Sequence, residues 1–471
     1  MDKARLDDFL TLPFDRECRK YWPASNQNIF DLMRTRLNTF IIGCLAFILS
    51  SALYAQQITA SGEPAQLDVR VSGANSIRVT LKPLSFKNDF PDTPSLAERK
   101  YPAPAISLLH LDKAVKKTVG KLTVEIKPSP LTLIISNSKG QNIQRIVFEN
   151  DGNVSFKTEG QPILGLGEGG PKPRRGAPWR TYPVQFDRSG TLDSMQPRWQ
   201  ADAYGSRNPA AVVIGTEGWA LFVATPWVLV DLRQQSRGLF IPWKQTESML
   251  TPQTEANQHL NQGKGIHPIH KIIPGLFDFF VFDAHIPGQF ATDFSAITGP
   301  AVLPPKWALG YMQSHRTLED DAQMIGIVDS FRIKKIPIDA VIYLGTGFTP
   351  KGWNKTQPSF EFNPEVFKRD PKWVIQEMHN RHVKVVLHMV PWDRDKLPAL
   401  HGSIPVRAGE VMDVSHISNY WKQHEDLIKT GVDAFWPDEG DWFDLFERIK
   451  RHQLYYQGHL STQPGIRPWS L

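Results

Sequence analysis

Cysteine is almost absent from this sequence of 471 residues. The chain contains only Cys18 and Cys44, and both precede the point near Ala55 at which an export signal would be cleaved. The chain beyond that point has no thiol, which excludes a disulfide framework, a cysteine-ligated metal and a cysteine nucleophile. We expect the hydrophobic core alone to hold the fold, and we expect no metal and no other cofactor.

Long basic runs are missing as well. The formal net charge is +6, but charged residues make up only 22% of the chain and are not gathered into a stretch that could follow a phosphate backbone. Nucleic acid is therefore not an expected partner. No glycine-rich Gly-x-Gly-x-x-Gly loop follows any strand predicted after Pro305, which weakens the case for an open, nucleotide-binding sheet there.

An export signal lies inside the chain rather than at its start. Met33 opens a basic segment, which is followed by the apolar run Phe40–Leu49 and by small residues up to Ala55. This order is typical of a signal peptide, so we expect residues 1–32 to be a mis-called extension, residues 33–55 to be the signal peptide, and the protein to be secreted or periplasmic. The apolar run is shorter than the roughly 20 residues of a membrane span, so membrane contact is expected only if the leader is retained as an anchor.

Residues 56–300 carry strand patterns of period two. Apolar and polar residues alternate in Leu67–Val71 and in Ile77–Leu81, with a turn around Gly73 between them. Such alternation is typical of half-buried antiparallel strands, and a β-sandwich is their natural assembly. Further strands are predicted at 122–126, 131–135, 211–214 and 219–223, the last two joined by a hairpin turn at Gly215–Gly218.

After Pro305 the pattern changes to short apolar runs that alternate with amphipathic segments of helical length. The runs predict strands at 308–312, 338–344, 383–390 and 432–436, with helices at 319–334, 371–382 and 416–430. Strand, helix and strand at this spacing predict parallel βα units, and a (β/α)8 TIM barrel is the commonest closed arrangement of such units. The fold class is therefore α/β plus all-β, with an open doubly wound sheet as the alternative for residues 301–471.

The last predicted strand ends in a group of acidic residues. Asp438, Glu439 and Asp441 follow it directly and are flanked by Trp436 and Trp442. Paired carboxylates beside aromatic rings suit glycoside hydrolysis, because one can attack or stabilise the anomeric carbon while another donates a proton. The alternative is that these acids cap the next helix, as Asp441 before Trp442 would do.

The segment Phe435–Gly440 resembles the nucleophile motif of glycoside hydrolase family 31, in which a strand-end Trp-x-Asp carries the attacking carboxylate. Four other segments resemble the family in the same order: 165–168, 199–205, 305–310 and 336–339. The resemblance spans about residues 64–471 and implies an N-terminal β-sandwich followed by a TIM barrel. It implies that Asp438 is the nucleophile of a retaining double displacement and that Asp202 contacts a sugar hydroxyl, and we expect Asp441 to contact the substrate as well.

Aromatic and histidine side chains are further candidates for substrate binding. Trp392 and Trp436 stand where the family shapes its first sugar subsite, with packing in the core or rim as the alternative for each. His388 and His315 are strand-end histidines that could hydrogen-bond sugar hydroxyls, with a purely structural role as the alternative for both.

Two departures from the family pattern limit what the resemblance implies. Many members have a sugar-binding Asp just after the second strand, whereas this chain has Leu344–Gly347 there, so specificity for glucose is left open. The family's general acid/base, an Asp in a Trp-x-Gly-Asp motif after the nucleophile, has no counterpart before Leu471. We therefore expect residues 301–471 to be the first half of the barrel, with 467–471 opening a fifth strand.

The resulting hypothesis is an exported, retaining hydrolase that acts on an α-linked glycoside and lacks its proton donor in the present chain. An incomplete barrel exposes a strand edge and an apolar face, so we expect the chain to associate and to cleave ordinary glycosides poorly. The alternative is a non-catalytic carbohydrate-binding remnant of the same fold, and within the enzymes a lyase or transglycosylase with the same covalent intermediate stays open.

Overall fold

The computed structural model describes residues 56–91, 93, 95–167, 186–194, 210–225, 228–243, 272–316, 318–356, 359–389, 414–438 and 445–471. The chain divides into two units, residues 1–56 and 57–471, and the helices and strands below belong to the second. Among the described helices, none has both the length and the apolar character that a membrane span requires. The predicted signal peptide at 33–55 lies outside the described residues.

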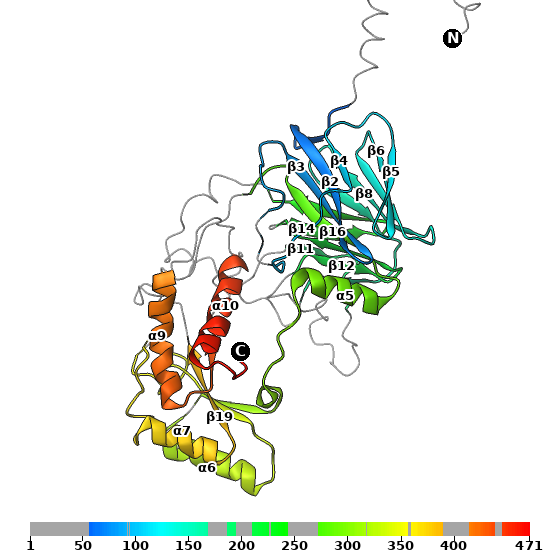
Figure 1. Cartoon of the computed structure of the whole chain (residues 1–471). Helices are drawn as coiled ribbons and strands as arrows, with labels where there is room; N and C mark the ends of the chain where they lie inside the picture. The colour runs from blue at the N-terminus through cyan, green and yellow to red at the C-terminus, as the bar shows by residue number, and fades with distance from the viewer. Residues whose placement is uncertain are drawn as a thin grey trace, which may run out of the picture. The chain divides into compact units, whose positions relative to one another are not determined.

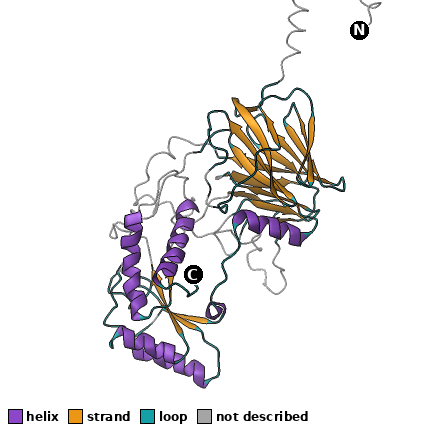
Figure 2. Cartoon of the chain, in the orientation of Figure 1, coloured by secondary structure: helices purple, strands orange, loops and turns teal. Residues whose placement is uncertain are grey.

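Two antiparallel sheets form the first part of this unit (Figures 1 and 2). In the first sheet the described strands run in the order β1 (Thr59–Ala60), β2 (Glu63–Gly73), β3 (Ser76–Pro83), β16 (Phe277–Asp283), β13 (Trp219–Val223), β12 (Val212–Gly215) and β10 (Ile163–Gly165), and β4 (Ile106–Leu108) pairs with β2. In the second sheet the order is β11 (Leu192–Ser194), β14 (Val228–Gln234), β15 (Arg237–Pro242), β9 (Val154–Lys157), β8 (Asn142–Phe148), β7 (Thr132–Ser136), β6 (Leu122–Lys127) and β5 (Val115–Val119).

One hydrophobic core draws side chains from both sheets. Leu67, Val79 and Phe279 of the first sheet belong to the same buried cluster as Val124 and Ile135 of the second. The strands predicted from the period-two patterns are all present, and the predicted hairpin pairs Gly215 with Trp219. The predicted N-terminal β-sandwich is confirmed.

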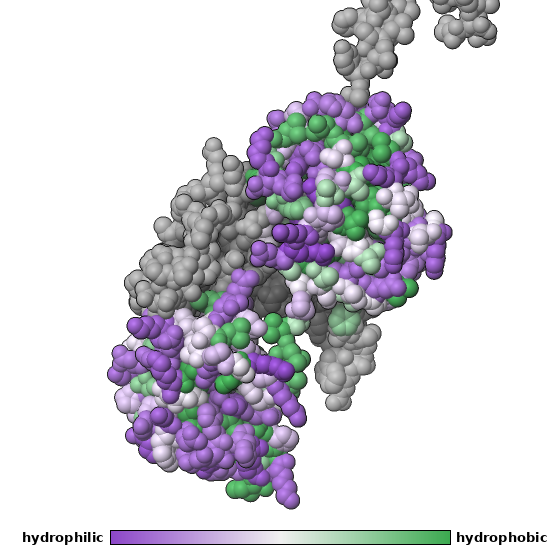
Figure 3. All heavy atoms as spheres, in the orientation of Figure 1, coloured by the Kyte–Doolittle hydropathy of each residue, from purple (hydrophilic) through white to green (hydrophobic). Residues whose placement is uncertain are grey.

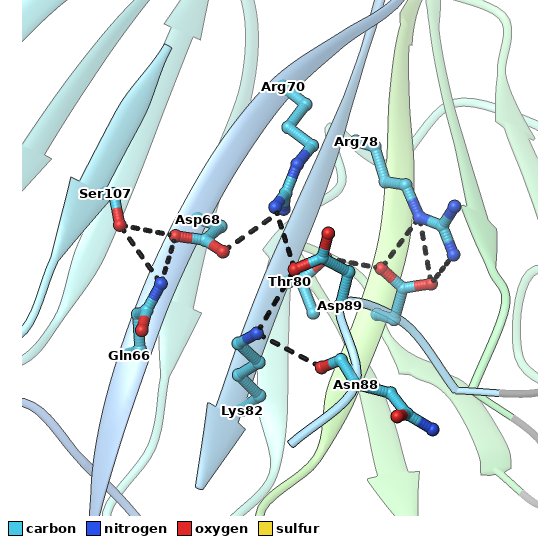
Figure 4. Close-up of polar contacts among 10 residues, drawn as sticks. Gln66, Asp68, Arg70, Arg78, Thr80, Lys82, Asn88, Asp89 and Ser107 are labelled. Atoms are coloured by element: carbon cyan, nitrogen blue, oxygen red, sulfur yellow. Dashed lines mark hydrogen bonds and ion pairs between the residues drawn. The ribbon is translucent and has the colours of Figure 1, made fainter. Parts of the chain in front are cut away.

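The prediction that β2 and β3 are only half-buried is wrong. Every residue of β3 is buried, including the polar ones. Arg78 Nη2 donates to Asp278 Oδ2 at 2.6 Å and Thr80 Oγ1 donates to Asp278 Oδ1 at 2.7 Å, and Figure 4 shows Arg78 and Thr80 with these contacts. The centroid of the Phe90 ring lies 3.5 Å from the Arg78 guanidinium carbon. The alternation predicted from the sequence exists, but the polar face is buried because its charges are paired with one another and covered by chain.

A helix covers part of the same face of the first sheet. Helix α5 (Pro287–Thr298) places Ile297, Phe290 and Phe294 against Phe222 and Phe282 in a second apolar cluster. Asp293 of this helix also accepts hydrogen bonds from the backbone N–H groups of the β2–β3 turn, at 3.1 and 2.7 Å. The sheet is therefore buried on both sides in this region.

The second part of the unit is a parallel βα arrangement. Four described strands pair in chain order as β17 (Met312–His315), β18 (Ala340–Tyr343), β19 (Lys384–Met389) and β20 (Ala434–Pro437). Helices α6 (Asp321–Ile333), α7 (Pro371–Asn380) and α9 (Val414–Thr430) connect successive strands, and α10 (Leu445–Thr462) follows β20. The predicted parallel βα segment of a partial TIM barrel is thus confirmed.

The two faces of the parallel sheet differ in what covers them. Val341, Tyr343, Val385, Leu387 and Phe435 share a buried cluster with side chains of α6, α7, α9 and α10. Their neighbours along the strands, such as Ile342, Val386 and Ala434, form a separate cluster on the opposite face. This second face is the one that lines the inside of a TIM barrel.

The first barrel strand was predicted at 308–312, and that prediction is wrong. Residues Lys306–Leu309 form a 3₁₀ helix, η4, and the strand begins only at Met312. Pro305 starts this turn and Gly310 N–H closes it by donating to Trp307 O at 3.1 Å. The strand itself reads Met-Gln-Ser-His and gives no apolar signal, so the preceding apolar residues were mistaken for it.

The predicted start of a fifth strand is supported at the end of the chain. Ser470 forms a parallel bridge with Phe435 of β20, and Leu471 N–H donates to Phe435 O at 3.3 Å. Trp469 packs edge-on against Trp307, with ring centroids 5.2 Å apart.

Candidate functional site

The register of β19 and β20 brings three candidate residues to one face of the sheet. Val386 pairs with Ala434 and His388 pairs with Trp436. Val386 and Ala434 face away from the helices, and side chains two residues apart on a strand share a face. His388, Trp436 and Asp438 therefore lie together at the carboxyl end of the sheet, on the face opposite the helices.

Asp438 is hydrogen-bonded to His388. His388 Nε2 lies 2.9 Å from Asp438 Oδ2, and Gly345 N–H donates to His388 Nδ1 at 3.1 Å. Because Nδ1 accepts this bond, a neutral ring carries its hydrogen on Nε2 and donates it to the carboxylate. The Asp438 side chain is 34% exposed and the His388 side chain is fully buried, so the carboxylate is accessible and its donor is not.

The backbone at Asp438 is held by the neighbouring strand. Its N–H lies within hydrogen-bonding distance of Met389 O, at 2.9 Å, and of Trp436 O, at 3.0 Å. The first contact continues the β19–β20 ladder by one residue beyond β20, so the side chain projects from regular, paired backbone. A functional group that projects from a paired strand in this way is positioned more precisely than one on a loop.

Aromatic rings and a loop fix the imidazole of His388. Phe348 and Trp436 pack edge-on against it, with ring centroids 4.9 and 4.7 Å away. Trp353, which is fully buried, donates its indole N–H to the carbonyl of His388 at 2.8 Å. Gly345, Phe348 and Trp353 all lie in the segment after β18, which has no periodic pattern that could have assigned them to the site.

The other predicted site residues fall into two groups. His315 ends β17 and pairs with Tyr343, whose side chain belongs to the helix-covered cluster, so the alternation puts His315 on the face opposite to that of Asp438. Asp202, Trp392 and Asp441 lie outside the described residues. Within the described part of the chain, no group of three or more His, Cys, Asp or Glu side chains is arranged to hold a metal ion.

An accessible carboxylate at the carboxyl end of a parallel strand, in a βα sheet that follows a β-sandwich, is the arrangement of a TIM-barrel enzyme with an accessory β domain. Residues 301–463 match the glycosyl hydrolases family 31 TIM-barrel domain. These residues therefore form part of a glycoside hydrolase family 31 TIM barrel.

Curated relatives support the same family. The chain is 27% identical over 261 residues to alpha-glucosidase 2 of Bacillus thermoamyloliquefaciens, a match that covers 53% of this chain and 29% of that protein. It is 24% identical over 172 residues to an alpha-xylosidase of Saccharolobus solfataricus, covering 35% of this chain and 23% of that protein. The matched region therefore spans less than a third of the length of these relatives.

Solved structures share the fold. A family 31 dextranase of Flavobacterium johnsoniae, in complex with isomaltotriose, matches 88% of this chain and 54% of its own chain, with a TM-score of 0.62 at 13% identity. A family 31 alpha-xylosidase from a soil metagenome, in complex with xylose, matches 89% of this chain and 65% of its own, with a TM-score of 0.61 at 13% identity.

Proposed function

We propose that this chain is part of a retaining glycoside hydrolase that cleaves an α-linked glycoside, with Asp438 as the nucleophile. The observation that carries the proposal is the position of Asp438: an accessible carboxylate at the carboxyl end of β20, inside the segment that matches the family barrel. The matched relatives, named an alpha-glucosidase and an alpha-xylosidase, support an α-linked substrate.

In this proposal a carboxylate oxygen of Asp438 bonds to the anomeric carbon while the bond from that carbon to the leaving oxygen breaks. A second acid protonates the leaving oxygen, and water then cleaves the resulting glycosyl ester with a second inversion, so the configuration is retained overall. None of the described residues is assigned as this second acid. Leaving groups that need little protonation should therefore be the best substrates for the chain as it stands.

The proposal also includes side chains that would contact the bound sugar. Trp436 is partly exposed and shares the face of Asp438, so it is the described ring best placed to border a bound sugar. Asp202, Trp392 and Asp441 keep their proposed substrate contacts on the strength of the family resemblance alone. His315 is less well supported because of the face it occupies, and export of the protein is proposed from the pattern at 33–55 alone.

The test is covalent trapping of the nucleophile. The full chain is incubated with fluorinated α-glucosyl and α-xylosyl fluorides, digested and analysed by peptide mass spectrometry. We expect a single glycosyl adduct on Asp438, and no adduct in Asp438→Asn. Asp426→Asn is the matched control, because it removes a 77% exposed carboxylate on α9 and should leave trapping unchanged.

A different pattern would overturn the assignment. An adduct on another carboxylate would show that Asp438 is not the nucleophile. Sugar binding that survives Asp438→Asn, without turnover of any activated aryl α-glycoside by the wild-type chain, would favour the alternative of a protein that only binds carbohydrate.

A further inference from the structure

We infer that His388 is a positioning residue for Asp438 rather than a ligand for the sugar. Its Nε2–H holds one carboxylate oxygen and thereby fixes the plane in which Asp438 meets the anomeric carbon. This inference rests on the proposed role of Asp438 as the nucleophile, and it contrasts with the sugar contact that the position of His388 at a strand end suggested.

The hydrogen-bonding capacity of the ring is used within the protein. A neutral imidazole has one donor and one acceptor, and here Nδ1 accepts from Gly345 N–H while Nε2 donates to Asp438. A sugar hydroxyl would have to displace one of these bonds. The side chain of His388 is also fully buried, which leaves it no surface to offer to a ligand.

The ring is held so that its donor has a fixed direction. Trp436 and Phe348 contact it from the sheet and from the loop after β18, and Trp353 anchors its backbone carbonyl. Rotation of the imidazole would break the Gly345 bond and disturb both ring contacts. A donor preorganised in this way needs no reorganisation when the carboxylate reacts, which is the condition under which positioning groups are effective.

The segment after β18, where the chain departs from the family pattern, also helps to hold His388 beside Asp438. Where many members have a sugar-binding Asp, this chain has Gly345, whose backbone N–H binds His388 Nδ1. The segment that would otherwise contact sugar directly thus selects the tautomer of the histidine that supports the nucleophile. The Gly345 N–H, the His388 imidazole and the Asp438 carboxylate are therefore linked by two consecutive hydrogen bonds.

Two substitutions at His388 test its two hydrogen bonds, to Gly345 and to Asp438, independently. His388→Gln can place an amide N–H near the position of Nε2, so this variant keeps a donor for Asp438. His388→Asn can place its amide oxygen near the position of Nδ1, so this variant keeps the acceptor for Gly345 and loses the donor. A purely structural role predicts similar effects for both variants, whereas a positioning role predicts rescue by Gln only.

The rate of trapping of Asp438 by the fluorinated glycosyl fluoride is measured for His388→Asn, His388→Gln and the wild-type full chain. We expect the limiting rate to fall by roughly ten- to a hundredfold in His388→Asn, the range for loss of a hydrogen bond to a charged group, and by less than about tenfold in His388→Gln. The concentration of the probe at half-saturation should stay within about twofold of wild type in both, because the sugar does not contact the ring. Equal rates in wild type and His388→Asn would overturn the positioning role.

A second measurement does not depend on activity. In the full chain labelled with ¹⁵N-histidine, the ring nitrogen shifts of His388, assigned by their loss in His388→Gln, should report the Nε2–H tautomer. The Nδ1–H tautomer, or an exchanging mixture, would overturn the inference even if Asp438 is trapped. Failure to trap wild-type Asp438 with either sugar, while the Nε2–H tautomer is present, would overturn the proposed function and this inference with it.

Discussion

His459 on α10 is a buried histidine whose ring nitrogens have no hydrogen-bond partner in the described part of the chain. The residue is 3% exposed, and its ring packs against Trp421 and Phe435 with centroids 5.5 and 5.6 Å away. Burial lowers the pKa of His459 to about 4, and the charge of Asp433 only partly opposes this. The folded protein therefore keeps this imidazole neutral under mildly acidic conditions.

The stability of the fold should accordingly fall as the pH decreases from 7 to 5. Between the ordinary pKa of histidine, near 6.5, and the lowered value, the unfolded chain binds a proton that the folded chain does not. The stability associated with the neutral, buried His459 is fully present above about pH 6.5 and is lost as the pH falls toward 4. At pH 5 this loss lowers the free energy of unfolding by about 2 kcal/mol. Urea unfolding at the two pH values should show this loss in wild type and a smaller one in His459→Phe.

The exposed His110 provides the control. His110→Gln should keep the pH dependence of wild type, because an exposed imidazole does not require desolvation. If His459→Phe and His110→Gln respond equally to pH, the burial of His459 is not the cause of the acid sensitivity.

At the scale of the elements, what could be predicted depended on burial. Strands β18, β19 and β20 are largely buried and read as apolar runs, so the sequence predicted them to within a few residues. Strand β17 is an edge strand of polar composition and was displaced in the prediction, and α10 was considered only as the helix that Asp441 could cap, without bounds. Its sequence includes Gly458, a helix-disfavouring residue that only the packing against α9 explains.

The candidate site was predictable only in part, for a similar reason. Asp438 follows an apolar strand directly, and alternation alone puts Trp436 on its face of the sheet. The placement of His388 beside them required the register between β19 and β20, which a single sequence does not specify. The contributions of Gly345 and Trp353 depend on the conformation of an irregular segment, which has no periodicity to reveal it.

Two helical glycines should respond in opposite directions to the same substitution. At Gly458 of α10, an added Cβ would lie 2.1 Å from Cδ2 of the buried Trp421, whereas at Gly326 of α6 it would meet nothing within 4 Å. We expect Gly458→Ala to destabilise the protein by about 1–3 kcal/mol, because the helix must move away from the indole. Gly326→Ala should stabilise it by about 0.5–1 kcal/mol through helix propensity.

Urea denaturation at pH 7 provides both values in one experiment. The two variants share the chemical change and differ only in what surrounds the new methyl group. A gain of stability in Gly458→Ala would mean that α10 does not pack against Trp421 as closely as the structure describes.

At the scale of the whole molecule, the segment that leads into the parallel sheet exposes apolar side chains in close succession. Val302, Leu303, Leu309 and Tyr311 are 56%, 62%, 74% and 48% exposed, and Figure 3 shows apolar areas of surface among the polar ones. Isolated exposed apolar residues are common, but several within ten residues favour contact with another surface. The association expected from the sequence therefore remains a prediction, now with a defined surface.

We expect sedimentation velocity to show association of the full chain that increases with protein concentration. The double substitution Leu303→Lys with Leu309→Lys should shift the chain toward monomer, because two charges on this segment oppose its burial against a second copy. Ile466→Lys is the control, since Ile466 is 56% exposed but lies in a different segment, and this substitution should leave the association unchanged. A monodisperse wild-type monomer at all concentrations would contradict the association itself, whereas an equal effect of Ile466→Lys would contradict its assignment to residues 302–311.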